Sequence, residues 1–426
     1  MNDLLIKNGT LVDPSQGIEG KMDLRIRGGL VAEFGPRLSG EEPVLDAKGL
    51  SVTPGLIDAH VHFREPGDEE EETIASGSAA AVAGGFASVA CMPNTEPPLD
   101  SEAAVSFVYL QAQKAGLCNV FPVGAITKGR AGRELAEMGS MVRGGAVAFS
   151  DDGTSVPTAG VLRRAMEYAH MLDKPLLEHC EEPSLVARGV MHEGRVSLVL
   201  GLAGSPAEAE EMIVARDVML ANLTGARLHI QHVSTAGSVG IVRNAKARGL
   251  SVTAEVAPHH LFLTDESVRG YNPSFKMAPP LRTSEDVAAC LAGLQDGTID
   301  LVASDHAPHS MKEKEVEFSA AAFGAIGLES TLGMLLTRLV HGRLMTLAEL
   351  LPRLTTAPAG LLGIARGTLK PGVAADVTLI DLKRKWTIDP ARFRSKSRNC
   401  PFAGTACTGR AVATVVGGRI AFRLEE

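Results

Sequence analysis

The chain has 426 residues, 45% of them hydrophobic, and 42 Lys and Arg against 50 Asp and Glu give a net charge of −8. At roughly 100 to 200 residues per domain, this length predicts two or three domains, or one large barrel with a small companion. The acidic balance argues against a nucleic acid or an anionic membrane as partner. The start shows no signal peptide, and no apolar run reaches the ~18 residues of a membrane span, so we expect a cytoplasmic protein.

The six cysteines are widely scattered and form no CxxC pair. In a long chain expected to lie inside the cell, this pattern argues against both a disulfide framework and a zinc ribbon. We therefore expect the cysteines to be buried, small apolar residues.

The sequence pattern at both ends of the chain predicts short strands. Turn signals at Asn8-Gly9 and Gly28-Gly29 separate alternating apolar runs in residues 1–53, which predicts antiparallel hairpins. The same pattern returns in residues 366–426, with runs at 376–381 and 411–416. We expect these two segments to pair into one small β domain, with residues 54–365 between them.

Eight short apolar runs alternate with helix-length segments in the central part of the chain. This alternation is typical of βα units and predicts a (β/α)8 barrel. The runs are 56–63, 87–92, 120–126, 146–149, 175–179, 228–232, 251–256 and 300–305. Segments rich in Ala, Leu, Glu and Arg, which favour helix, are 102–115, 161–172, 207–222, 239–247 and 284–294. The acidic run 68–72 is interpreted as the solvated start of another helix.

Reactive side chains gather where the predicted strands end. Barrel enzymes carry their chemistry at the C-terminal ends of the strands, where the βα loops meet. The runs end in or next to His60, His62, Asn94, Asp151, Asp152, His179, His232 and Asp305. His60 and His62 are two apart, so both rings face the same side of a strand. Four imidazoles with two carboxylates form a ligand set suited to Zn²⁺, and one carboxylate shared by two ions would leave room for a nucleophilic hydroxide.

The other histidines receive different interpretations. His229 lies three residues before His232, so a regular strand would turn it toward the helix layer, in a structural role. His259 and His260 are candidates for support of the site, whereas His170, His192 and His341 are expected to have no catalytic role. His309 follows the last strand, on the face expected to bind substrate.

Several motifs resemble one family. The segment 54–67 (PGLIDAHVHFREPG), together with Ser304-Asp305-His306-Ala307-Pro308-His309, resembles the amidohydrolase superfamily and, within it, the dihydroorotases. Segments similar to the same family are 91–95, 149–153, 178–180 and 229–234, and the resemblance extends to residues 372–376. The combination of motifs is specific to dihydroorotases, whereas HxH alone marks only the superfamily.

The resemblance implies a (β/α)8 barrel with a small β-sandwich, and the reversible cyclisation of N-carbamoyl-aspartate to dihydroorotate in pyrimidine synthesis. It implies that His60, His62 and Asp305 hold a first zinc ion, that His179 and His232 hold a second, and that a carboxylate bridges them. Strand parity does not separate Asp151 from Asp152, and the choice of Asp152 rests on the resemblance. Hydantoinases, dihydropyrimidinases and allantoinases, like many dihydroorotases, have a carboxylated Lys at the bridge. The segment 150–152 (Ser-Asp-Asp) contains no Lys and is similar to the bacterial long-chain dihydroorotase type, which favours a dihydroorotase over the other ring-opening enzymes. Whether one or two zinc ions bind is left open.

The mechanism implied is attack of the metal-bound hydroxide on the ring amide, with Asp305 carrying the proton to the leaving nitrogen. Arg64 is placed to hold the substrate carboxylate, with Asn94 and His309 adding hydrogen bonds. His62 is also counted among the substrate contacts. The family further uses backbone groups that match Phe323 and Gly324. One departure is Ala278, where the family has an Asn that contacts substrate.

Two other functions compete with this one. A hydantoinase-like enzyme would open rings that lack a carboxylate and would not depend on Arg64. A metal-free scaffold subunit is expected to have degraded ligands, and here all six positions are filled. The resemblance also makes aspartate transcarbamoylase a candidate partner, and we expect a homo-oligomer, a dimer. The polar segment 310–322 is expected to act as a mobile lid over the site.

Overall fold

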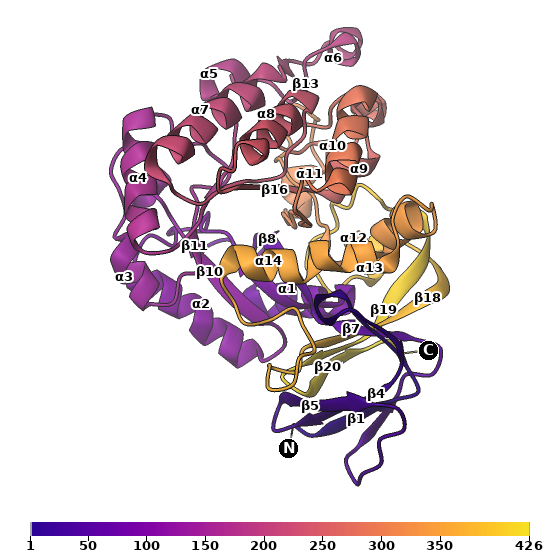
Figure 1. The fold of residues 1–426 in the computed structure, drawn as a ribbon. Coiled ribbons are helices and arrows are strands. Elements are labelled where there is room, and N and C mark those ends of the chain that lie inside the picture. Colours follow the sequence, from indigo (N-terminus) through magenta and orange to yellow (C-terminus); the bar gives the residue numbers. More distant parts are fainter. Residues whose placement is uncertain (1, 426) are drawn as a thin grey trace.

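A computed structural model describes residues 2–425. Its centre is a parallel sheet of eight strands in the order β17-β16-β15-β12-β11-β10-β9-β8, curved into a barrel (Figure 1). The strands are β8 (Leu56–Val61), β9 (Phe86–Cys91), β10 (Asn119–Gly124), β11 (Ala148–Phe149), β12 (Leu176–Glu178), β15 (Leu228–Ile230), β16 (Val252–Val256) and β17 (Leu301–Val302). Each falls within or beside one of the eight predicted runs. The predicted (β/α)8 barrel is confirmed.

The first and last strands of the barrel meet just beyond β17. Val61 and His306 form an isolated parallel bridge, and the His62 amide donates a hydrogen bond to the His306 carbonyl at 2.9 Å. These contacts join the two edges of the sheet beside His60, His62 and Asp305.

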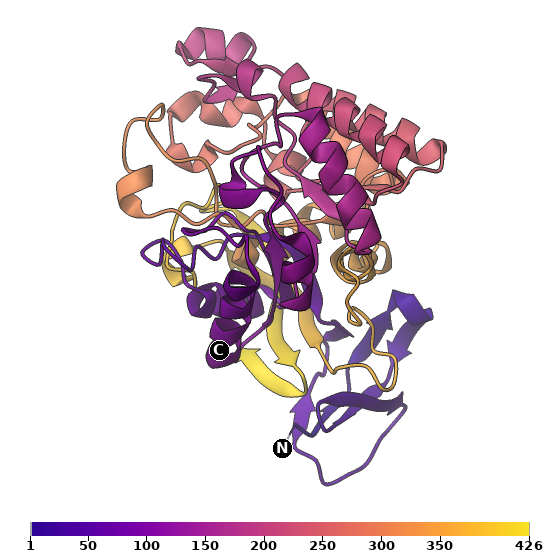
Figure 2. The same ribbon diagram turned by 90° about the vertical axis from the view of Figure 1, so that its left-hand side faces the viewer.

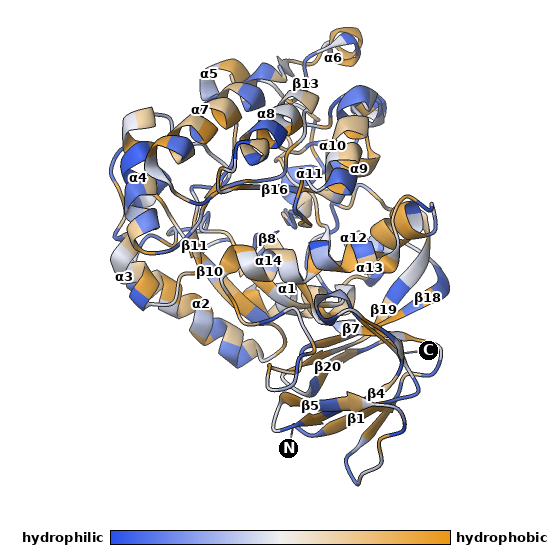
Figure 3. Ribbon diagram, viewed as in Figure 1, coloured by the Kyte–Doolittle hydropathy of each residue, from blue (hydrophilic) through white to orange (hydrophobic). Residues whose placement is uncertain are grey.

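Helices surround the barrel, and their surfaces carry both hydrophobic and hydrophilic residues (Figure 3). The helices that follow the strands are α1 (Ile74–Gly84), α2 (Glu102–Ala115), α3 (Met138–Arg143), α4 (Ala159–Met171), α7 (Glu208–Thr224), α8 (Ala236–Ala247), α10 (Ser284–Asp296) and α12 (Leu328–Leu335). Local signals fix their ends: Ser101 caps the first turn of α2, and Gly116 ends it with φ +61°. The five predicted helices lie within three residues of observed boundaries.

Shorter elements lie in the loops and across the base of the barrel. They are α5 (Pro183–Val186), the β13 (Met191–His192) and β14 (Gly204–Ser205) pair, α6 (Arg195–Leu200), α9 (Pro258–Phe262), α11 (Met311–Lys314), α13 (Leu347–Leu350) and α14 (Thr356–Leu362). Helix α14 packs Ala359 and Leu362 against Ile57 of β8. It therefore closes the end of the barrel at which the strands begin.

The two terminal segments share one β-sandwich at the end of the molecule opposite α6 (Figures 1 and 2). One sheet has the order β5-β4-β1-β6, and the other β20-β19-β18-β7-β2-β3. The strands are β1 (Leu4–Lys7), β2 (Thr10–Asp13), β3 (Ile18–Lys21), β4 (Asp23–Arg27), β5 (Leu30–Gly35), β6 (Val44–Asp46), β7 (Ser51–Pro54), β18 (Val377–Thr387), β19 (Ala406–Val416) and β20 (Arg419–Arg423). β7 pairs with β18, and buried residues of both sheets form one core. The exact division at residues 53/54 and 365/366 stays a prediction.

One of the two predicted hairpins is wrong. β4 and β5 pair across Gly28-Gly29 as expected, but β1 and β2 lie in different sheets. The chain crosses between the sheets at Asn8-Gly9, where a Cβ on Gly9 would lie 2.5 Å from Val52. The turn signal was correct, but tertiary packing decides the partner strand.

All six cysteines are buried and free, as predicted. Within residues 2–425 no helix has both the length and the apolar composition needed to cross a membrane.

Candidate functional site

The side chains predicted for the site meet at the end of the barrel where the strands finish. His60 lies in β8, His62 follows it, and Asp152, His179, His232 and Asp305 follow β11, β12, β15 and β17 within three residues. All six residues are buried. The atoms of His60, His62 and Asp305, and those of His60, Asp152 and His232, form two groups within 4.8 Å that could hold a metal ion.

Asp152 lies at the centre of this cluster. Its Oδ1 is 3.4 Å from His60 Nε2, 3.6 Å from His232 Nε2 and 3.7 Å from His179 Nδ1. Its Oδ2 is 3.5 Å from His62 Nε2. The carboxylate therefore faces both histidine pairs, which is the position that a bridging ligand needs.

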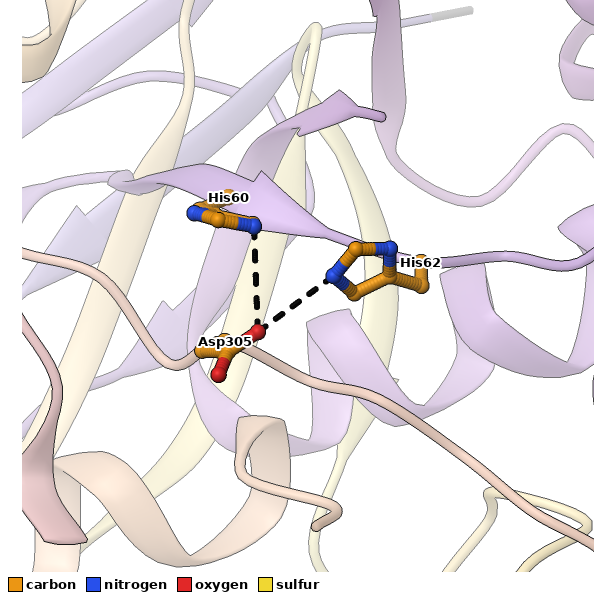
Figure 4. Close-up of side chains that lie close together, drawn as sticks. All are labelled: His60, His62 and Asp305. Carbon is orange, nitrogen blue, oxygen red and sulfur yellow. Dashed lines mark hydrogen bonds and ion pairs between the residues drawn. The ribbon is translucent and has the colours of Figure 1, made fainter. Parts of the chain in front are cut away.

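Asp305 approaches the first pair from the opposite edge of the sheet (Figure 4). Its Oδ1 lies 3.3 Å from His62 Nε2 and 3.7 Å from His60 Nε2. Its Oδ2 points toward His259 Nε2 at 3.8 Å. Burial lowers the pKa of His259 to about 4, so this imidazole is neutral at ordinary pH.

The neighbouring aspartate faces away from the histidines. Asp151 Oδ1 accepts hydrogen bonds from the amides of Ile126 and Thr127, and Oδ2 accepts one from the Thr127 hydroxyl. Arg130 donates to the Asp151 and Asp152 carbonyls, and this residue escaped the sequence analysis. The geometry therefore favours Asp152 over Asp151, which strand parity could not do.

Hydrogen bonds fix which ring nitrogen of His60, His62 and His179 faces the centre of the cluster. His60 Nδ1 is 2.6 Å from Glu255 Oε1, and His62 Nδ1 is 2.8 Å from Asn94 Oδ1. Because these oxygens accept hydrogen bonds from Nδ1–H, the Nε2 atoms of both rings face the centre of the cluster. His179 is reversed, with Nε2 at 3.0 Å from Glu181 and Nδ1 facing inward.

The buried charges of the cluster fit a cation. Burial opposes the charged form of His60, but the Asp152 and Glu255 carboxylates outweigh it and hold the pKa of His60 well above its usual value. Burial is likewise outweighed at Asp152, whose pKa lies well below normal beside His60, His179 and His232. Among the described residues, His60 Nε2 and Asp152 Oδ1 have no hydrogen-bond partner. A divalent ion would satisfy both atoms, and nitrogen and oxygen ligands suit Zn²⁺.

Three residues at this end of the barrel have left-handed backbone conformations. The φ angles are +32° at His232, +47° at Asp305 and +60° at Arg64. Such conformations cost residues other than glycine free energy and persist where the surrounding structure holds them. Here they turn the chain sharply after the strands end, and at His232 and Asp305 the side chains face the cluster.

The strand turn at His232 corrects the prediction for His229. His229 does not face the helix layer: its Nε2 is 3.1 Å from Glu255 Oε2, and the other oxygen of Glu255 contacts His60. The parity count failed because the backbone bends between the two histidines. Glu255 was missed, although polar residues at 253 and 255 in a run otherwise apolar are a signal that both point into the barrel.

Arg64 and His309 lie together beside the cluster. Arg64 Nε donates to the Pro308 carbonyl at 3.1 Å and is 2.9 Å from Glu71 Oε2, while Nη2 is 3.2 Å from His309 Nε2. The predicted solvated helix start is therefore wrong in part. Residues 68–70 are exposed, but Glu71 and Glu72 are buried, because Glu71 pairs with Arg64 and Glu72 with His306.

The remaining predicted substrate contacts are engaged within the protein. The Phe323 carbonyl lies 2.6 Å from His309 Nε2, and the Gly324 amide donates to the Lys276 carbonyl at 2.9 Å. In the segment 310–322, the Lys314 ammonium donates to the carbonyls of Ala322 and Gly324. This segment is thus tied to the loop that follows it, and its action as a lid stays a prediction.

A parallel barrel with a histidine and aspartate cluster at its strand ends defines a cyclic amidohydrolase of the amidohydrolase superfamily. A family model described as Dihydro-orotase-like matches residues 49–238. Dihydroorotases of Pelotomaculum thermopropionicum and Pelobacter propionicus are 55% and 52% identical, over 98% and 99% of this chain and 98% and 100% of their own. The chain belongs to the dihydroorotase family.

Solved structures agree on the fold. The L-hydantoinase (dihydropyrimidinase) of Arthrobacter aurescens superposes with a TM-score of 0.89 at 27% identity, covering 100% of this chain and 98% of that one. A dihydropyrimidinase of Brevibacillus agri gives a TM-score of 0.86 at 22% identity, over 99% and 95%. Both results place the chain in the amidohydrolase fold.

Proposed function

We propose that this chain catalyses the reversible, zinc-dependent cyclisation of N-carbamoyl-L-aspartate to (S)-dihydroorotate in pyrimidine biosynthesis. The observation that carries the proposal is the convergence of six buried ligand side chains at one end of the barrel, in a chain 55% identical to a protein named dihydroorotase.

The ligand assignment follows the contacts of Asp152. His60, His62 and Asp305 would hold one ion, His179 and His232 a second, and Asp152, which faces both histidine pairs, would bridge them. Bound zinc would supply Lewis acidity toward the ring carbonyl and lower the pKa of the attacking water. Glu255, Asn94 and Glu181 orient the histidines through their other ring nitrogens.

Asp305 is the proposed proton carrier. In ring opening, water adds to the amide carbonyl carbon, the carbon–nitrogen bond breaks, and the nitrogen needs a proton. Asp305 Oδ1 faces His60 and His62, which leaves Oδ2 to take the proton from the water and return it to the nitrogen. Cyclisation follows the same steps in reverse.

Arg64 is the proposed anchor for the ring carboxylate, because a planar guanidinium group can donate two parallel hydrogen bonds. Its Nε is held by Pro308 and Glu71, which fixes the plane of the group. His309 contacts Arg64 and the Phe323 carbonyl, and we propose that it joins Asn94, His62 and the backbone of Phe323 and Gly324 in binding substrate.

The deciding experiment measures zinc content and turnover of dihydroorotate by the purified protein, with hydantoin and dihydrouracil as parallel substrates. We expect bound zinc, opening of dihydroorotate and no comparable turnover of the rings that lack a carboxylate. Metal-loaded protein that opens hydantoin but not dihydroorotate, with or without aspartate transcarbamoylase, would refute the proposal.

The setting of the enzyme is also proposed. We infer a cytoplasmic homodimer that can associate with aspartate transcarbamoylase, because some members of the dihydroorotase family associate with that enzyme. Light scattering of the purified protein, alone and mixed with that enzyme, measures both assemblies. A monomer that stays separate from the transcarbamoylase would contradict this part of the proposal and leave the catalytic part intact.

A further inference from the structure

A basic cavity lies where the C-terminal strands meet α1 and α12. It has a volume of about 580 Å³ and shares no residue with the candidate site. Its basic side chains come from β18, β19, β20, the turn Pro390–Arg392 and the loop that follows this turn, and they are Arg384, Lys385, Arg392, Arg394, Arg410 and Arg423. Among residues 2–425, only three acidic residues line it, namely Glu329, Asp389 and Glu425. This local excess of positive charge contrasts with the net charge of −8 of the whole chain.

The guanidinium groups of the cavity are not neutralised by their neighbours. Within residues 2–425, none of its five arginines forms an ion pair, although arginines elsewhere in the chain commonly do. Burial lowers the pKa of Arg410, Glu329 opposes this effect, and the nearby charges of Arg384 and Arg392 add to it. Like charges are therefore held together without a matching set of carboxylates.

The acidic residues of the cavity are occupied with the backbone. Glu329 Oε1 accepts hydrogen bonds from the Arg394 and Ser395 amides at 2.7 and 3.1 Å, and Asp389 Oδ1 accepts one from the Ala391 amide at 3.1 Å. Burial raises the pKa of Glu329 to about 7, so this group carries only part of a charge at neutral pH. Both carboxyl groups therefore hold the loop backbone in place and neutralise little of the positive charge of the arginines.

A rigid wall supports part of the cluster. The Arg410 guanidinium carbon lies 4.5 Å from the centre of the Trp386 ring, and Trp386 Nε1 donates to the Gly409 carbonyl at 3.0 Å. The indole packs against Gly333 of α12, where a Cβ would lie 2.5 Å from its Cζ2. Because the indole is fixed on one side by α12, it holds Arg410 in place on the other.

We propose that this cavity is a binding site for a small anion that carries two or more phosphate groups. Its size is that of small-molecule sites. Guanidinium groups match phosphate oxygens with paired hydrogen bonds, and several of them around one cavity provide more positive charge than a single carboxylate can neutralise. Inorganic triphosphate and a nucleoside triphosphate share this chemistry, and the experiment separates them.

Trp386 makes the test specific, because it is the only tryptophan of the chain. We would titrate the zinc-loaded enzyme with inorganic triphosphate and with ATP, and follow tryptophan emission. We expect a saturable change below about 1 mM, weakened at least about tenfold in Arg384→Gln/Arg392→Gln. Tighter binding of ATP would show that a nucleoside adds contacts, and equal binding would show that the phosphate chain alone is recognised.

The control variant is Arg195→Gln/Arg248→Gln, which removes the same charge from exposed positions outside the cavity. It should bind triphosphate like the unmodified enzyme, and circular dichroism should show that both variants are folded. If only the cavity variant loses the fluorescence response, then removal of zinc by triphosphate cannot be the cause of that response. No saturable change up to about 10 mM, an equal change with sulfate at the same ionic strength, or equal weakening in the control would overturn the proposal.

Discussion

The two ends of the barrel are built from the same strands but for different purposes. Where the strands finish, buried imidazoles and carboxylates face one another and several atoms lack partners among the described residues. Where the strands begin, α14 packs apolar side chains against Ile57 of β8 and Leu301 of β17. The comparison indicates that stability is concentrated at one end and reactivity at the other, as in barrel enzymes generally.

The sharpest test of this division uses two aspartates that flank β17. Asp305 lies in the cluster, whereas Asp300, at the start of the strand, pairs with Lys246 at 2.6 Å and accepts the Ala254 amide. Asp305→Ala should lower kcat for dihydroorotate by about 10³-fold or more, because the proposed proton carrier is lost. Asp300→Ala should keep kcat and lose about 1–2 kcal/mol of unfolding free energy. Steady-state kinetics and urea unfolding measure the two effects, and similar kinetic losses in both variants would break the comparison.

The closed end should respond in the opposite way. Leu362→Ala removes a buried side chain of α14 and should cost about 2–5 kcal/mol of unfolding free energy with kcat unchanged in the folded protein. Leu110→Ala on exposed α2 is the matched control and should cost well under about 1 kcal/mol. A kcat that falls in parallel with stability would show that the two ends are coupled.

Glu255 supports the reactive end, since it is the penultimate residue of β16 and contacts His60. Glu255→Gln should weaken zinc binding by about 10- to 100-fold, because His60 loses its charged partner. Competition with a chelator measures the affinity. Glu266→Gln, which removes an exposed carboxylate paired with Arg269, should leave it unchanged. Equal zinc affinity in both variants would mean that Glu255 has only a structural role.

A smaller effect concerns the segment beside the site. Burial lowers the pKa of Lys314 from 10.5 to about 7. Between these values the unfolded chain binds a proton that the folded chain does not, so stability should rise with pH across this window and be lowest below pH 7. Lys314→Met should remove this slope in urea unfolding, and Lys312→Met, which loses an exposed pair with Glu70, should keep it. An unchanged slope in Lys314→Met would contradict the assignment.

The strands and helices of the barrel could be predicted because each local signal agrees with the fold. Runs of buried residues locate the eight strands, and Ser101 and Gly116 locate the two ends of α2. The pairing of β1 and β2 could not be predicted, because Asn8-Gly9 permits a turn without specifying which strand lies beside it.

The strand-end pattern pointed to the positions of His60, His62 and Asp305, which the structure brings together, but it left Asp151 and Asp152 unseparated. The site was not predictable where contacts depend on side chains that meet across the barrel. Glu255 contacts both His60 and His229, and Glu71 contacts Arg64. No sequence pattern around Glu255 or Glu71 predicts these partners. Because the backbone turns at His232, strand parity also gives the wrong side of the sheet for His229.

The bridge between Val61 and His306 places a constraint on the order in which the enzyme can mature. His60 and His62 leave the ribosome more than 240 residues before Asp305, so the growing chain holds only part of the proposed metal site for much of its synthesis. Domains fold from the N-terminus as they emerge, but this ring closes only when its last strand arrives. Metal capture and activity therefore report that the whole barrel has been completed.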